Sequence, residues 1–160
     1  MAGSSVLRVK QQLIELMQVQ FPDASFEPPT VASDVFGSDG SGKAVWWDDT
    51  AADGEFSEPV FVGPGHVWQD EVAHATLVLQ VIGRDTDDTQ EVVDGEAEDL
   101  FAFARSAMVG DPTLGIASDS EVQVRTVLPK RWTYSGGITQ ASQRAVRIAV
   151  EVEINARVLS

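Results

Sequence analysis

The residues that come nearest to a chemical site are a run of carboxylates that leads into a predicted helix. Acidic side chains crowd positions 85–99: Asp85, Asp87, Asp88, Glu91, Asp94, Glu96, Glu98 and Asp99. With Asp85 as the first ligand of an EF-hand loop, Asp87, Thr89 and Glu96 fall at ligand positions. A small acidic, calcium-dependent binding module is therefore one candidate function.

The same run is also typical of a plain acidic surface. Gln90 stands where an EF-hand loop needs glycine, and a helix is predicted on only one side of the loop. Carboxylates near a helix N-terminus are stabilised by the helix dipole without any ion. We therefore predict no cofactor, and an acidic channel or surface patch made of Asp85, Asp87, Asp88 and Glu91. Such a patch would repel DNA phosphates if it faced a channel.

Other catalytic and metal-binding patterns do not occur in the sequence. The two histidines, His66 and His74, fall in a predicted turn and a predicted strand, with no spacing that would let them share a metal ion. Cysteine is absent, which excludes disulfides and thiolate metal sites. No nucleophile, zinc or phosphate-loop motif is present either. We predict no catalytic, cofactor-binding or metal-binding residue, and a protein that is not an enzyme.

Aromatic residues give a second candidate surface. Trp46, Trp47, Trp132 and Tyr134 fall in predicted loops and strand ends, outside the apolar stripes of the helices. Aromatic residues at such places either anchor a protein–protein interface or fill the edges of a sheet, and both interpretations stay open here. Two arginines of the last predicted strand complete the set of candidate contacts between subunits or with a tube: Arg147 and Arg157.

Hydrophobic periodicity predicts the elements that must position these residues. Helical spacing predicts helices over 5–20 and 89–109. Alternation predicts strands over 71–83, 121–128 and 142–158, and short strands are expected over 31–36, 43–47 and 58–62. Turn residues predict an acidic loop over 48–54 and a hairpin tip over 135–140, reached through an irregular segment that begins at Pro129. Residues 23–70 thus form a loop-rich insertion.

This order predicts an α+β fold in a single domain, 1–160: an antiparallel β-sheet with two α-helices packed on one face and a long C-terminal β-hairpin. The strand over 142–158 places valine, isoleucine and alanine on one face and mostly polar residues on the other. It would span on the order of 40 Å, about twice the usual length. We expect it to bend sharply or to leave the domain as an arm, and either course would suit contacts with other copies.

The charge of the chain is large and unevenly distributed. The formal net charge is −14, which argues against a groove that neutralises nucleic-acid phosphates. Through Ser118 the chain carries 5 basic and 21 acidic side chains, whereas from Asp119 onward it carries 6 basic and 4 acidic ones. Such asymmetry permits head-to-tail attraction between copies. No secretion signal or membrane-spanning apolar run is recognised, so a cytosolic protein is expected.

Nearly the whole chain resembles the tail terminator (tail completion) proteins of long-tailed, siphovirus-like bacteriophages. The resemblance rests on an opening helix that ends at Phe21-Pro22, the strand over 73–83, and a second helix followed by residues 108–115. It continues through the final hairpin, whose last strand ends in residues 152–158.

The resemblance implies a structural virion protein that forms a ring, a hexamer in that family, at the head-proximal end of the tail. Such a ring is assembled in the host cytoplasm, caps the tail tube, ends its polymerisation and offers a face to the head–tail connector. Its implied partners are other copies of itself, the tail tube protein and the connector, with no membrane. DNA would pass through without specific binding. A tail tube subunit or a head-closure protein is the alternative within the same class.

Overall fold

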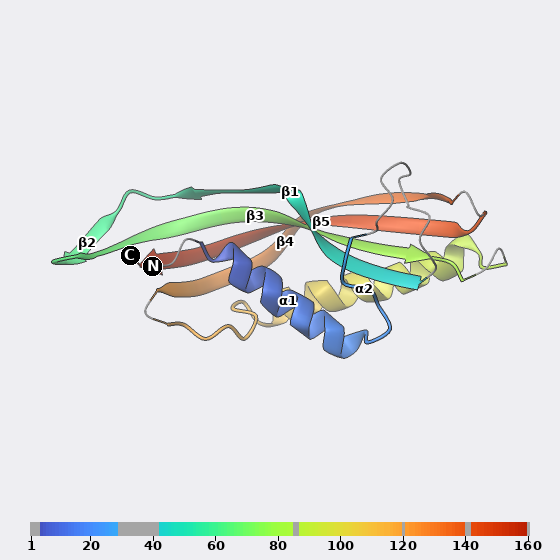
Figure 1. The fold of residues 1–160 in the computed structure, drawn as a ribbon, viewed down its shortest axis with the longest axis horizontal. Coiled ribbons are helices and arrows are strands. Elements are labelled where there is room, and N and C mark those ends of the chain that lie inside the picture. Colours follow the sequence, from blue (N-terminus) through green and yellow to red (C-terminus); the bar gives the residue numbers. More distant parts are fainter. Residues whose placement is uncertain (1–3, 29–41, 85–86, 120, 140–141, 160) are drawn as a thin grey trace.

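The protein folds as one antiparallel sheet with two helices, which confirms the predicted α+β class (Figure 1). The computed structural model describes residues 4–28, 42–84, 87–119, 121–139 and 142–159. The elements follow in the order α1 (Val6–Gln20), β1 (Gly42–Phe56), β2 (Val60–Gly63), β3 (His66–Ile82), α2 (Gln90–Gly110), β4 (Val122–Ile138) and β5 (Arg144–Leu159). The strand order is β1-β3-β5-β4, with β2 paired to the first residues of β3. The strand expected over 31–36 lies outside the described residues.

The long strand predicted over 142–158 exists as β5, and of its two expected courses the arm is wrong. β5 pairs with β3 in one unbroken register from Trp68 opposite Leu159 to Ile82 opposite Ala145. On its other side it pairs with β4, in a register that shifts at two bulges. Because both of its edges are hydrogen-bonded, β5 is not an arm. The sheet accommodates its length by twisting as a whole (Figure 1).

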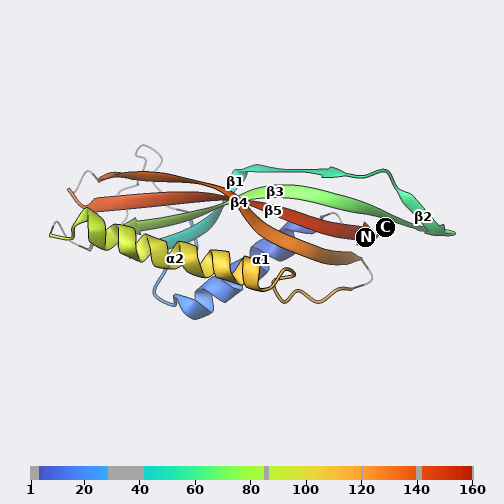
Figure 2. The ribbon, with the colours of Figure 1, turned by 180° about the vertical axis from the view of Figure 1, so that it is seen from behind.

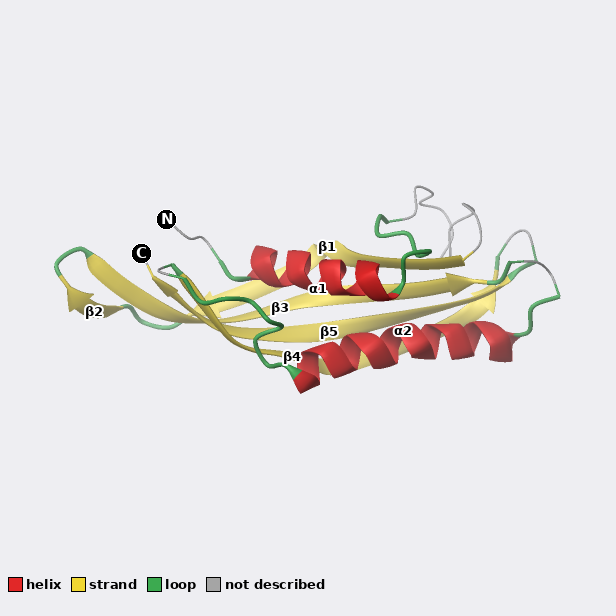
Figure 3. Ribbon diagram, turned by 90° about the horizontal axis from the view of Figure 1, so that it is seen from below, coloured by secondary structure: helices red, strands yellow, loops and turns green. Residues whose placement is uncertain are grey.

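Both helices cover the same face of the sheet, and the core lies between them and the strands (Figures 2 and 3). The apolar stripes contribute Val9, Leu13 and Met17 from α1, and Val93, Ala97, Leu100, Ala104 and Met108 from α2. Thr89 caps α2, since its hydroxyl accepts a hydrogen bond from the backbone N–H of Val92 at 3.3 Å. Phe21 and Phe103 meet edge to face, with ring centroids 5.6 Å apart, and join the two helices.

The start of α1 is held by a buried carboxylate of β3. Glu71 is only 3% exposed, and its Oε1 accepts hydrogen bonds from the backbone N–H of Ser5, at 2.9 Å, and from the Ser5 hydroxyl. Ser5 directly precedes the helix, where backbone N–H groups lack partners within the helix. The carboxylate therefore fixes the helix to the sheet and is favoured there by the helix dipole.

Two predicted irregular segments are instead parts of strands. Residues 48–54, expected as an acidic loop, belong to β1, whose register with β3 shifts between Asp48 and Asp53. Gly136 and Gly137, expected at a hairpin tip, pair with β5 inside β4, and the chain reverses instead where Thr139 N–H bonds to Gln143 O at 2.8 Å. Both strands lie at the edges of the sheet, where bulges and prolines such as Pro129 are tolerated.

Candidate functional site

The predicted aromatic residues lie within strands and do not form one cluster. Trp47 is 8% exposed, belongs to the core beneath α1, and donates from Nε1 to the carbonyl of Lys10 at 3.1 Å. Trp46 points to the opposite, helix-free face and is 9% exposed. These two residues therefore stabilise the protomer itself. Because both side chains are buried, the structure gives no support for their expected role at an interface.

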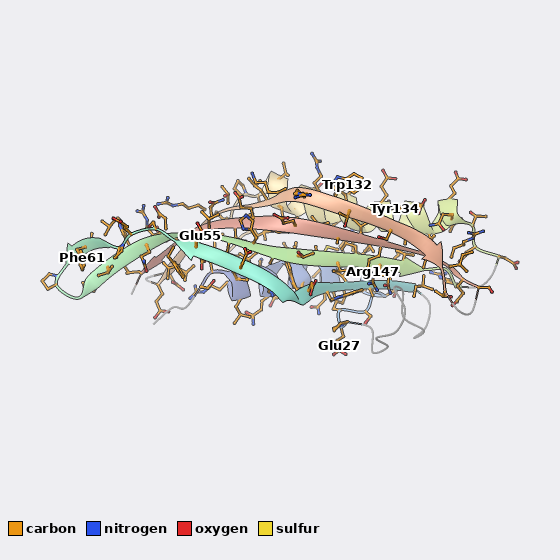
Figure 4. The ribbon with its side chains drawn as sticks, turned by 90° about the horizontal axis from the view of Figure 1, so that it is seen from above. Glu27, Glu55, Phe61, Trp132, Tyr134 and Arg147 are labelled. Carbon is orange, nitrogen blue, oxygen red and sulfur yellow. The ribbon has the colours of Figure 1, made fainter. Side chains whose placement is uncertain are left out.

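Arg147 lies on the helix-free face of the sheet (Figure 4). It stands beside Trp46 there. Its guanidinium stands 5.4 Å from the centre of the Trp46 ring and donates to Oε1 of Gln80, at 3.1 Å from Nε and 2.6 Å from Nη2. Burial lowers the pKa of this guanidinium. Arg147 is therefore committed to contacts inside the protomer.

Trp132 and Tyr134, in contrast, are accessible on the edge strand β4. Trp132 is 62% exposed and meets Phe101 of α2 with ring centroids 6.0 Å apart. The Tyr134 hydroxyl donates to Oδ1 of Asp94 at 2.8 Å, and this bond raises the pKa of Tyr134. Between β4 and α2 lies a groove of about 350 Å³, lined by Asp94, Glu98, Phe101, Trp132, Tyr134 and Ile148.

Arg157 of β5 contacts two residues near the start of β3. Its Nε donates to Oδ1 of Asp70 at 2.9 Å, and its guanidinium lies 3.9 Å from the centre of the Trp68 ring. The hydrogen bond from Arg157 lowers the pKa of Asp70, with the charge of Arg125 adding to the effect. Like Arg147, this arginine makes contacts within the protomer.

The predicted acidic patch is only partly within the described structure. Asp85 lies outside the described residues, Asp87 and Glu91 are exposed, and Asp88 accepts a hydrogen bond from Arg84 N–H at 2.8 Å through Oδ2. No group of three or more histidine, aspartate or glutamate side chains in the described parts of the chain is arranged to hold a metal ion. The patch remains a prediction about surface charge.

A polar network on the helix-free face was not predicted from the sequence. His74 lies between two carboxylates, with Nδ1 3.3 Å from Asp53 Oδ1 and Nε2 3.3 Å from Glu153 Oε2. The pKa of Glu153 is lowered, mainly by a hydrogen bond from Asn155 and to a smaller extent by contacts with His74 and Lys130. The network joins strands that are far apart in the sequence, so no local motif could have revealed it.

The most conspicuous surface is a run in which every residue is exposed although most of it is strand. We call residues 52–66 the arm; it comprises the distal part of β1, all of β2 and the turn into β3. Its apolar side chains include Phe56, Val60, Phe61 and Val62, which are 48%, 50%, 77% and 54% exposed. Figure 4 shows Phe61 at the tip of the arm. The signal for this surface in the sequence is the Val-Phe-Val run between Pro59 and Gly63, which predicts a strand but not its exposure.

No model of a known protein family matches the chain, and no curated protein is similar to it in sequence. Among the described residues, neither helix is long and apolar enough to cross a membrane.

Proposed function

We propose that the chain is a tail terminator of a long-tailed bacteriophage, a structural subunit that closes into a ring on the tail tube. The observation that carries the proposal is the arm, which exposes Phe61 and three neighbouring apolar side chains at the end of the sheet. Contiguous exposed apolar surface is typical of a site that another protein covers. A subunit whose function is assembly needs such a surface for contact with its neighbours.

The arrangement of the sheet supports a ring over a symmetric pair. β1 with β2 forms one edge and β4 the other, so the two edges differ in sequence and in shape. Contacts between unlike edges are heterologous, and repeated heterologous contacts produce a closed ring or an open helix. A terminator needs the closed form, and the family resembled by the sequence forms hexamers.

The net charge of −14 fits a ring through which DNA moves. An acidic lumen repels phosphates and offers no groove in which DNA would be retained. In this proposal the ring ends polymerisation of the tail tube and presents its other face to the head–tail connector, at the head-proximal end of the virion tail.

Negative-stain electron microscopy of the purified protein, alone and with tail tubes from the phage that encodes it, tests this proposal. We expect single rings at tube ends, and tubes that no longer grow when tube protein is added. Long filaments of the protein alone would identify a tube subunit, and binding to heads but not to tubes would identify a head-closure protein. Monomers in both samples would contradict a structural role in the tail.

A further inference from the structure

Strand β2 of the arm has the apolar run of a strand that is covered on both faces, but its side chains are exposed in the protomer. A half-buried strand alternates apolar and polar residues, whereas a fully buried strand is continuously apolar. The consecutive residues Val60, Phe61 and Val62 follow the second pattern, although all three are at least half exposed. Such an exposed apolar run suits a surface that another chain covers.

The arm is held in position by its hydrogen bonds to β3. Ser57 N–H bonds to Asp70 O at 2.8 Å, and Asp70 N–H bonds to the Ser57 hydroxyl at 2.9 Å. Gln69 Nε2 donates to Ser57 O at 2.9 Å. Because the arm is already ordered in the protomer, docking it would cost little conformational entropy.

The opposite edge of the sheet has a second exposed apolar strip. We call residues 130–138 the β4 edge; its large apolar side chains are Trp132, Tyr134 and Ile138, which are 62%, 47% and 55% exposed. Within the described structure, the backbone bonds that β4 makes outside the sheet join Val127 N to Pro112 O and Asp119 N to Val122 O, and both lie before the β4 edge begins. An unpaired strand edge can accept a strand from another chain.

The charges of the two surfaces are opposite. The sequence from position 44 to 83 contains no lysine or arginine, and the arm carries the exposed carboxylates of Glu55 and Glu58. The sequence from position 122 to 150 contains no aspartate or glutamate, and the β4 edge carries Lys130 and Arg131. Two open edges of opposite charge on one chain are complementary between copies.

We propose that the arm of one copy docks on the β4 edge of the next copy, with Phe61 entering the groove beside Trp132. This inference rests on the ring proposed above and names the two surfaces that build it. The contact is heterologous, because the arm and the β4 edge lie on opposite edges of the same sheet (Figure 4). Each protomer therefore uses one surface for each of its two neighbours.

The charges around the groove set the direction in which the arm enters. Asp94 and Glu98 of α2 line the groove on the helix side. Arg131 belongs to a hollow on the other side of Trp132, together with Thr76, Ala149 and Glu151. The first side presents two carboxylates, whereas the second presents one carboxylate beside a guanidinium. The carboxylates of the arm are therefore repelled less by the second side, so the apolar tip meets Trp132 while Glu55 and Glu58 approach Arg131.

Charge reversal tests the proposal in free protein and on tubes alike. We expect Arg131→Glu alone, and Glu55→Arg with Glu58→Arg, each to weaken ring formation by about tenfold or more, because like charges then face each other. All three changes in one chain are expected to restore rings, since every contact regains opposite charges. Ring formation is measured by sedimentation velocity, and on tubes by the fraction of capped ends.

A mixing experiment tests whether the contact is heterologous. Phe61→Asp removes a working arm and Trp132→Asp a working β4 edge, so neither variant alone is expected to form rings. Their mixture is expected to stop at dimers, because one good arm meets one good edge. The control Val19→Asp changes a residue of α1 that is 84% exposed and outside both surfaces, and should form rings normally.

The outcomes separate this inference from the proposed function. If Phe61→Asp forms rings as the wild type does, the docking of the arm is overturned and the terminator role is left intact. Rings of Phe61→Asp that no longer cap tubes would assign the arm to the tube protein, and so overturn the inference as well. Rings that survive every change in the β4 edge would exclude that edge as the partner surface. Wild-type protein that forms no ring, free or on tubes, would contradict the function itself.

Discussion

Strand β3 passes through two regions of opposite character. From Ala73 to Val81, every second side chain points into the core and is at most 1% exposed. Beside its first residues lies the arm, in which every residue from 52 to 66 is exposed. The same sheet thus carries a part that stabilises the protomer and a part that contributes little to its folding. Substitutions in the first part should change the free energy of unfolding, and substitutions in the arm should change contacts with other chains.

The largest contrast is expected between Leu77→Ala and Phe61→Ser. Leu77 is fully buried in the core, so truncation should lower the free energy of unfolding by about 2–5 kcal/mol. Phe61 is 77% exposed, and its replacement should change that free energy by less than about 0.5 kcal/mol. Urea unfolding of dilute, monomeric protein measures both. Equal losses in the two variants would mean that the arm is part of the folding unit.

Glu71 lies on β3 at the border between the two regions, and its removal should have an intermediate effect. Glu71→Ala leaves the N–H and hydroxyl of Ser5 without their buried acceptor, which should cost about 1–3 kcal/mol. Hydrogen exchange of the first turn of α1 should increase in this variant. Glu71→Gln keeps an acceptor oxygen and serves as the control, with a smaller loss in the free energy of unfolding. If both variants lose the same free energy, charge and not hydrogen bonding holds the helix.

The smallest effect is expected from an ion pair at the surface near the start of β4. The Asp119 carboxylate accepts hydrogen bonds from the Arg8 side chain and from the backbone N–H groups of Val122 and Glu121. Together these hydrogen bonds lower the pKa of Asp119 from 3.8 to about 2. A lowered pKa favours the charged carboxylate in the folded state. Its stabilisation is therefore complete above about pH 4 and is lost as the pH falls toward 2.

The thermal midpoint of Asp119→Asn should accordingly fall less between pH 4 and pH 2 than that of the wild type. Arg8→Gln should also reduce the fall of the thermal midpoint between pH 4 and pH 2. The double variant should behave much like either single variant, because the two side chains form one ion pair. A double variant whose slope is reduced by the sum of both effects would show that the two side chains act independently.

The sequence predicted those parts of the fold that depend on one strand or helix at a time. Alternation located the buried positions of β5 and β3, and helical spacing located Val93 to Met108 on α2. It did not find that Gly136 and Gly137 are in a strand, because glycine has low strand propensity and only pairing with β5 holds it there. For the same reason the acidic segment after Asp48 was assigned to a loop, although pairing with β3 makes it part of β1.

The candidate surfaces were predicted less well, because exposure depends on the whole fold. The sequence predicts the same kind of place for Trp132 and Trp47, a loop or a strand end, but the first lies on an open edge and the second beneath α1. The apolar run of the arm was visible in the sequence. Its lack of cover could be recognised only when the helices were seen to cover a different part of the sheet.

The place of β5 has a consequence for the order in which the protein is made. β5 lies between β3 and β4, although it follows every other strand in the chain. Its pairing with β3 spans the whole of α2 and β4, and contacts between such distant segments form slowly. On the ribosome, β3 and β4 have no strand to join them until residues 144–159 emerge. A nascent chain thus has no finished sheet before that segment is made, and the ring proposed above could assemble only after its synthesis.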